Sequence, residues 1–456
     1  MTNALYYVVS FIVTVGVLVV IHEFGHYVAA RLVGVKILRF SVGFGKPILI
    51  RRKGRDQTEW VVSAIPLGGY VKMLDEREGE VAASEAHRAF NRQSVAARIF
   101  IVLAGPAANF FLAFLVYWAL FIVGLPGMKP VVGDPPRNTP AAIAGLANGD
   151  TVRSVADEPV ATWSDVRWLL LKEAVKRGAT PIEVETARGA LAAHSLDLSR
   201  LTKEDLDKDL LEKVGLRAFR PNAPARIGRP LPGRAAERAG FAAGDLVVSI
   251  GGKPVATWSD FKNEVSSNPG RSLAFEIERA GQRLQLRATP DIEGKGDNRI
   301  GLLGVEPPAE ALREYERMST TVRYGPVAAI PKAALKVYDL SLFSVKMLGR
   351  MVVGDVSWKN LSGPITIADY AGQSAQLGWI TWLGFLALVS VSLGVLNLLP
   401  IPLLDGGHLV YYLAEIVKGS PVSERTMEIG QRFGLALLLG LTFFAFYNDL
   451  NRLFTG

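Results

Sequence analysis

The chain has 456 residues, 49% of them hydrophobic, and its mean hydropathy of +0.24 is high for a soluble protein. Its net charge of +8 is spread along the chain, which fits membrane topology better than nucleic-acid binding, so no nucleic-acid partner is expected. The absence of cysteine excludes disulfides, thiolate metal sites and cysteine nucleophiles.

The first apolar run, Ala4–Ile21, continues directly into the sequence IHEFGHYVAARL at residues 21–32. A helix rises about 1.5 Å per residue, so residues 4–30 cross a bilayer only if this polar motif lies inside it. No Lys or Arg precedes the run, which favours a membrane span over a cleaved signal peptide.

The motif places two histidines and a glutamate in the form HExxH, with His22, Glu23 and His26. Residues i and i+4 share a helix face, so the two imidazoles can bind one metal ion while Glu23 acts as a general base. Polar groups without a functional role are costly inside a membrane. This cost disfavours the alternative, in which the two histidines are only hydrogen-bonded within the core of a helix bundle.

Three further apolar runs predict membrane spans: Ile99–Leu125, Leu377–Leu404 and the shorter Phe433–Asn448. The loop Arg31–Arg98 holds 13 Lys/Arg against 7 Asp/Glu, which predicts a cytoplasmic location. The N-terminus and the segment between the second and third spans are then expected outside. The same loop predicts a β-hairpin over Leu38–Leu67, either at the membrane or packed on the cytoplasmic side of the spans.

An internal repeat with an offset of 95 residues organises the segment between the second and third spans. VATWSD occurs at residues 160–165 and 255–260, and AGLANGD at 144–150 matches AGFAAGD at 239–245. Long and few repeats favour tandem globular domains, and their pattern resembles bacterial PDZ domains. A generic α+β repeat without a ligand is the alternative. The first copy carries a charged helical insertion at Leu201–Val214.

A charged helix follows the repeats, with Lys and Arg at helical spacing on one stripe. It is too charged to span a membrane, which favours an interfacial amphipathic helix, although packing on the repeat domains is an open alternative.

The third span ends in NLLPIPLLDGGH, residues 397–408. A catalytic zinc usually takes three protein ligands. Asp405 is the best third ligand, because Pro400 and Pro402 break the helix and broken helices at membrane depth line cavities. His408 is the rival ligand.

With HExxH in the first span, NxxPxxxLDGG in the third and tandem PDZ domains between, the chain resembles the site-2 protease family of intramembrane zinc metalloproteases, in its bacterial sigma-E branch. The resemblance implies Zn²⁺, with His22, His26 and Asp405 as ligands and Glu23 as catalytic acid/base. It also implies substrate contacts by Asn397, Gly43 and Gly45.

The implied reaction is cleavage of a peptide bond within the membrane span of a single-span protein, such as a pre-trimmed anti-sigma factor or a signal-peptide remnant. The implied location is the bacterial inner membrane, with periplasmic PDZ domains and the active site toward the cytoplasm. A membrane scaffold with a structural metal is the alternative function. A metal transporter is disfavoured, because the chain lacks repeated membrane halves.

The predicted fold is a polytopic α-helical membrane protein with four spans, a membrane-associated β-hairpin and two α+β PDZ domains. Its predicted parts are residues 1–125 (two spans and the hairpin), 126–221 and 222–308 (PDZ domains), 322–353 (the amphipathic helix) and 377–456 (two spans and the LDGG motif).

Overall fold

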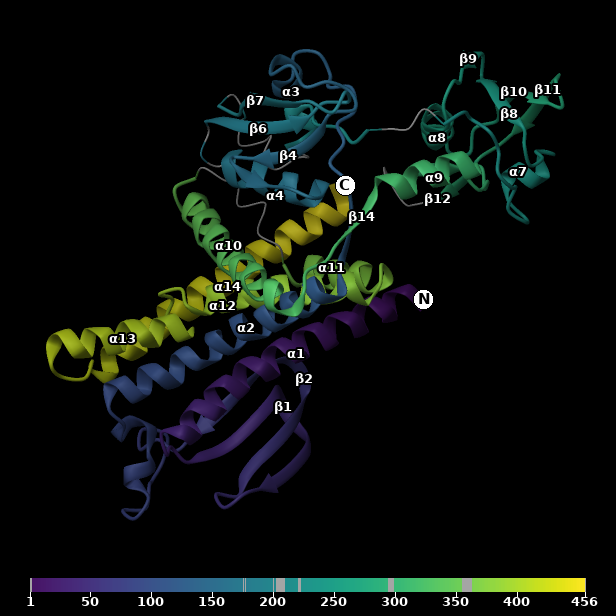
Figure 1. The fold of residues 1–456 in the computed structure, drawn as a ribbon. Coiled ribbons are helices and arrows are strands. Elements are labelled where there is room, and N and C mark those ends of the chain that lie inside the picture. The colour runs from purple at the N-terminus through teal and green to yellow at the C-terminus, as the bar shows by residue number, and fades with distance from the viewer. Residues whose placement is uncertain are drawn as a thin grey trace. The chain divides into compact units, whose positions relative to one another are not determined.

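The computed structural model describes residues 2–174, 176, 178–199, 201, 210–219, 223–293, 299–354 and 363–455. The chain forms two compact units, one from Met1–Leu125 with Arg323–Leu453 and the other chiefly from Pro126–Val322. The first unit is helical with one β-hairpin, and the second is α+β (Figure 1).

The helices of the first unit are α1 (Thr2–Leu32), α2 (Val95–Val123), α10 (Pro326–Val352), α11 (Pro364–Gln376), α12 (Trp379–Asn397), α13 (Asp405–Lys418) and α14 (Glu424–Thr455), and two short 3₁₀ turns, Ala86–Arg88 and Phe90–Arg92, precede α2. Among the described residues, four helices are long and apolar enough to cross a membrane, namely α1, α2, α12 and α14.

Helix α2 packs against α1, α10, α12 and α13 (Figure 1). It begins where the Ser94 side chain caps the backbone N–H of Ala97 and ends at Gly124, whose φ of 107° suits glycine. Buried hydroxyls add directional bonds between the helices. Ser390 Oγ of α12 donates to the Asn109 carbonyl of α2 at 2.7 Å, and Trp382 Nε1 donates to Thr14 Oγ1 of α1 at 3.0 Å.

The C-terminal helix α14 is tied to the start of α11 by one buried carboxylate. Asp449 accepts hydrogen bonds from the backbone N–H groups of Gly363, Ile365 and Thr366 at 2.9–3.1 Å. It therefore acts as an N-cap supplied from another helix, because the first N–H groups of a helix lack partners within it.

The third apolar run gives a shorter helix than predicted. Helix α12 ends at Asn397 rather than Leu404, and α13 begins at Asp405. The prolines at 400 and 402 prevent a continuous helix, and the chain then folds back tightly. A Cβ at Gly406 would lie 2.2 Å from the Leu399 carbonyl oxygen, so only glycine fits this turn.

The β-hairpin of the first unit pairs β1 (Ile37–Lys53) with β2 (Thr58–Met73) in antiparallel fashion and is longer than predicted. It lies along α1 (Figure 1). There, the Tyr27 ring is 5.1 Å from the Trp60 ring. At its turn, a hydrogen bond from Arg88 holds the pKa of Asp56 below its usual value. The apolar side chains of Ile48 and Leu49 in β1 are 73% and 62% exposed.

The second unit contains two copies of one α+β arrangement. The first sheet has the order β5-β4-β6-β7, and the second has the equivalent order β9-β8-β10-β11. The strands of the first copy are β4 (Thr151–Val155), β5 (Glu158–Pro159), β6 (Ala179–Glu185) and β7 (Leu191–Asp197), and those of the second are β8 (Leu246–Ile250), β9 (Lys253–Pro254), β10 (Leu273–Arg279) and β11 (Gln282–Ala288). The accompanying helices are α3 (Pro140–Ile143) and α4 (Trp163–Ala174) in the first copy and α7 (Ala235–Arg238) and α8 (Trp258–Ser266) in the second.

The residues that are repeated in the sequence make the same hydrogen bonds in both copies. The Asp165 carboxylate accepts from the backbone N–H of Thr162 at 2.9 Å, and Asp260 accepts from Thr257 at 2.9 Å, which caps helices α4 and α8 alike. In the Gly-Asp turns, Asp150 and Asp245 each accept from a backbone N–H three residues earlier at 2.8 Å. The repeat therefore encodes helix starts and turns.

Smaller elements complete the second unit: β3 (Leu125–Met128), α6 (Leu210–Val214), β12 (Asp291–Glu293), β13 (Ile300–Leu302), α9 (Ala309–Met318) and β14 (Ser319–Val322). Residues 202–209 of the predicted helical insertion lie outside the described residues, and its last part is α6.

Candidate metal centre

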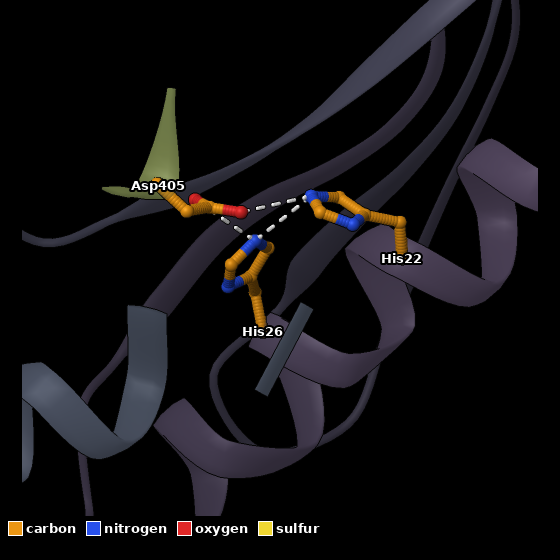
Figure 2. Close-up of side chains that lie close together, drawn as sticks. All are labelled: His22, His26 and Asp405. Atoms are coloured by element: carbon orange, nitrogen blue, oxygen red, sulfur yellow. Dashed lines mark hydrogen bonds and ion pairs between the residues drawn. The ribbon is translucent and has the colours of Figure 1, made fainter. Parts of the chain in front are cut away.

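Helix α1 and the first residue of α13 bring three side chains to one point (Figure 2). The Nε2 atoms of His22 and His26 are 3.2 Å apart. The Asp405 carboxylate faces both, with Oδ2 3.2 Å from His22 Nε2 and Oδ1 3.5 Å from His26 Nε2. Both histidines are only 9% exposed. The one-turn spacing of the histidines places their rings on one face of α1, as HExxH predicts.

These distances fit a zinc ion. Two ligand atoms at about 2.1 Å from a tetrahedral zinc lie about 3.4 Å apart, close to all three observed separations. The donor set of two imidazoles and one carboxylate is typical of catalytic zinc. Asp405 Oδ2 is also buried without a hydrogen bond, although His22 Nε2 is 3.2 Å away. A bound cation would satisfy this buried oxygen.

Helix α2 supports the two imidazoles from behind. His26 Nδ1 lies 2.8 Å from the Ile101 carbonyl oxygen, and His22 Nδ1 lies 3.2 Å from Asn109 Nδ2. Between these contacts, a Cβ at Gly105 would lie 2.2 Å from His26 Nε2, so a larger residue would displace the ring. Sequence analysis missed Gly105 and Asn109. In the sequence, Asn109 is an amide within the uncharged second span, one helical turn after Gly105.

Glu23 lies at a cavity of about 650 Å³ that also reaches His26, Asp405 and His408. Glu23 is not part of the three-residue cluster, which agrees with a base rather than a ligand. His408 borders the cavity but is outside the cluster as well, so the geometry favours Asp405 over its rival.

The three predicted substrate-binding residues lie elsewhere in the first unit. Gly43 and Gly45 are in β1, where φ values of 93° and 86° and shifts in strand register require glycine. Asn397 is the last residue of α12. A different glycine meets helix α1: a Cβ at Gly69 of β2 would lie 2.9 Å from Glu23 Cγ. The hairpin thus approaches Glu23 through β2.

Helix α1 could cross a membrane, and it places two buried imidazoles against a half-buried carboxylate, with a glutamate at the adjoining cavity. This arrangement defines a metal-dependent hydrolase site in a membrane protein. The model of peptidase family M50 matches residues 10–441, and the chain belongs to this family.

Curated relatives match nearly the whole chain. Regulator of sigma-E protease RseP of Escherichia coli is 42% identical over 453 residues, covering 99% of this chain and all of the relative. A putative zinc metalloprotease of Neisseria meningitidis is 42% identical and covers 97% of this chain and 98% of its own. A solved structure, the PDZ domain of the SdrC-like protein from Listeria monocytogenes, is 13% identical, with a TM-score of 0.16 over 20% of this chain and 90% of that chain.

The chain is therefore a zinc metalloprotease of the site-2, intramembrane type, homologous to RseP. This confirms the resemblance, the class of enzyme and the cofactor that the sequence motifs predict.

Proposed function

We propose that His22, His26 and Asp405 are the zinc ligands and that Glu23 is the catalytic acid/base. The observation that carries the proposal is the set of three ligand-atom separations of 3.2–3.5 Å, which match the edges of a zinc tetrahedron. The position of Glu23 at the adjoining cavity supports its separate role.

When bound, zinc supplies Lewis-acid chemistry that acidifies water and polarises a scissile carbonyl. The Glu23 carboxylate accepts a proton from the water that attacks the carbonyl carbon. It then returns this proton to the amide nitrogen as the carbon–nitrogen bond breaks, so that a carboxylate and an amine leave. The cavity beside Glu23 gives water a place next to the site.

The β-hairpin is proposed to hold the substrate. A spanning helix hides its amides in hydrogen bonds, so the segment to be cut must unwind and find new backbone partners. A free strand edge offers such partners by strand addition. The close approach of Gly69 to Glu23 supports this role. Gly43, Gly45 and Asn397 are proposed to contact the unwound segment.

The proposed substrates are single-span membrane proteins of the anti-sigma factor type, including those already trimmed outside the membrane, and signal-peptide remnants. The name of the relative, regulator of sigma-E protease, supports this class. The basic loop at residues 31–98 supports an inner-membrane orientation with the site toward the cytoplasm. Residues 126–221 and 222–308 are then periplasmic PDZ domains, an assignment that the shared strand order of the two copies supports.

The proposal is tested with Glu23→Gln, which keeps the size of the side chain but removes the base. We expect the purified variant to hold as much zinc as the wild type and to cleave a single-span substrate slower by roughly 10²–10⁴-fold. Near-normal cleavage would remove Glu23 from the mechanism. Zinc loss together with activity would make Glu23 a ligand instead.

A further inference from the structure

Asn109 of α2 is fully buried beside the metal centre, and one of its side-chain atoms has no partner. Its Nδ2 lies 3.2 Å from His22 Nδ1, while its Oδ1 is buried without a hydrogen bond. Its backbone carbonyl is fixed by Ser390 Oγ of α12 at 2.7 Å. A buried amide oxygen without a partner is costly, so this arrangement needs an explanation.

The hydrogen bond made by His26 shows which tautomer a metal-binding histidine needs at this site. Its Nδ1 lies 2.8 Å from the Ile101 carbonyl oxygen, which can only accept, so Nδ1 carries the hydrogen. The lone pair of neutral His26 is then on Nε2, the atom that faces Asp405. Histidines that bind metals generally donate their other ring N–H in this way.

His22 needs the same tautomer, because its Nε2 is the atom 3.2 Å from Asp405. An amide N–H directed at His22 Nδ1 would make Nδ1 an acceptor and place the hydrogen on Nε2, where it blocks metal binding. Rotating the Asn109 amide by 180° exchanges Oδ1 and Nδ2. This rotation turns His22 Nδ1 into a donor to Oδ1 and moves Nδ2 to the position without a partner. The number of unpaired amide atoms stays the same, so the rotation is favoured by the His22 tautomer that metal binding needs.

We propose that Asn109 is a positioning residue that accepts a hydrogen bond from His22 Nδ1–H through Oδ1, which holds the His22 tautomer that leaves Nε2 free for zinc. The inference rests on the proposed zinc site. It adds that α2 fixes the tautomer of both proposed ligand histidines, His26 through a backbone carbonyl and His22 through a side-chain amide.

The test compares zinc affinity, by chelator competition, in the full-length protein purified in detergent. Asn109→Leu removes the acceptor and is expected to weaken zinc binding roughly 10–100-fold, the usual effect of losing such a partner. Asn109→Asp keeps an acceptor but cannot donate, and it is expected to restore wild-type affinity. Ser392→Ala, the matched control on α12, removes an exposed hydroxyl that donates to the Leu388 carbonyl at 3.1 Å, and it is expected to leave zinc affinity unchanged.

Two results would overturn the inference. If Asn109→Asp binds zinc as weakly as Asn109→Leu, the amide acts as a donor, and if Asn109→Leu binds like the wild type, the amide has no role. The variant His22→Ala tests the zinc site itself. Unchanged zinc affinity in His22→Ala would show that His22 is not a ligand, whereas weakened affinity would keep the zinc site and leave only the role of Asn109 in question.

A measurement on the wild type covers the case in which Asn109→Leu does not fold. In zinc-loaded protein labelled with ¹⁵N-histidine, we expect a hydrogen-bonded Nδ1–H on His22 that exchanges slowly with water. An Nδ1–H of His22 that exchanges freely with water would contradict the proposal.

Discussion

At the scale of single residues, Asp405 and His408 are the two candidates for the third zinc ligand. They are three residues apart and border the same cavity. Only Asp405 reaches both histidines of α1, within 3.2–3.5 Å. We expect Asp405→Ala to lose both zinc and activity, because two imidazoles alone leave the site incomplete. His408→Ala, the matched control, should retain zinc. Metal analysis of the two purified variants checks this, and the opposite pattern would reverse the assignment.

The sequence indicates the proposed ligands but not the residues that support them. His22, Glu23 and His26 are recognisable because their spacing is local and carries its own chemical meaning. Asn109 acts on His22 from 87 residues away, and a lone amide in an apolar span has no spacing that indicates its partner. The role of Ile101 rests on a backbone carbonyl, which any residue provides.

At the scale of elements, helix α13 must be held in place if Asp405 is to meet α1. Arg98 of α2 and Glu415 of α13 form a bidentate ion pair at 2.7 and 3.1 Å, and both side chains are nearly buried, at 11% and 12% exposure. The Arg98 guanidinium also lies 4.9 Å from the centre of the Tyr412 ring. The pair thus fixes α13 against α2 about ten residues after Asp405, the proposed zinc ligand.

Removing one partner leaves a buried charge unpaired. We expect Glu415→Gln to destabilise the protein by about 3–5 kcal/mol, seen as a lower thermal midpoint in detergent, and to weaken zinc binding as α13 loosens. The charge exchange Arg98→Glu with Glu415→Arg should recover part of both losses. An unchanged thermal midpoint in Glu415→Gln would show that the pair does not hold α13.

The sequence predicts the long helices and the break between α12 and α13 but not the turn that joins them. The apolar runs indicate the helices and the two prolines indicate the break, whereas the tight turn at Gly406 depends on a close approach to the Leu399 carbonyl. The approach of β2 to Glu23 through Gly69 lies beyond the predicted end of the hairpin. Residues 39–42 of β1 pair with residues 59–62 of β2 and again with residues 69–72, so β2 continues past Leu67.

At the scale of the whole molecule, the chain inserts residues 126–376, including both α+β copies, between the two segments that carry the proposed zinc ligands. We propose that the two copies select substrates by the size of their outer part. Deletion of residues 134–308 is then expected to allow cleavage of substrates that keep their outer domain. If the copies are instead an activating receptor, cleavage of pre-trimmed substrate should fall. Assays of both substrates with the deletion variant separate these outcomes, and no change in either rate would rule out both roles.

The central claim is that this zinc peptidase cuts inside the membrane. The most direct measurement is the mass of the fragments that the purified wild type releases from a single-span substrate in lipid vesicles, with and without a zinc chelator. We predict new termini within the apolar span of the substrate and no fragments after zinc removal. Termini in the loops outside the span, or unchanged cleavage after zinc removal, would contradict the account.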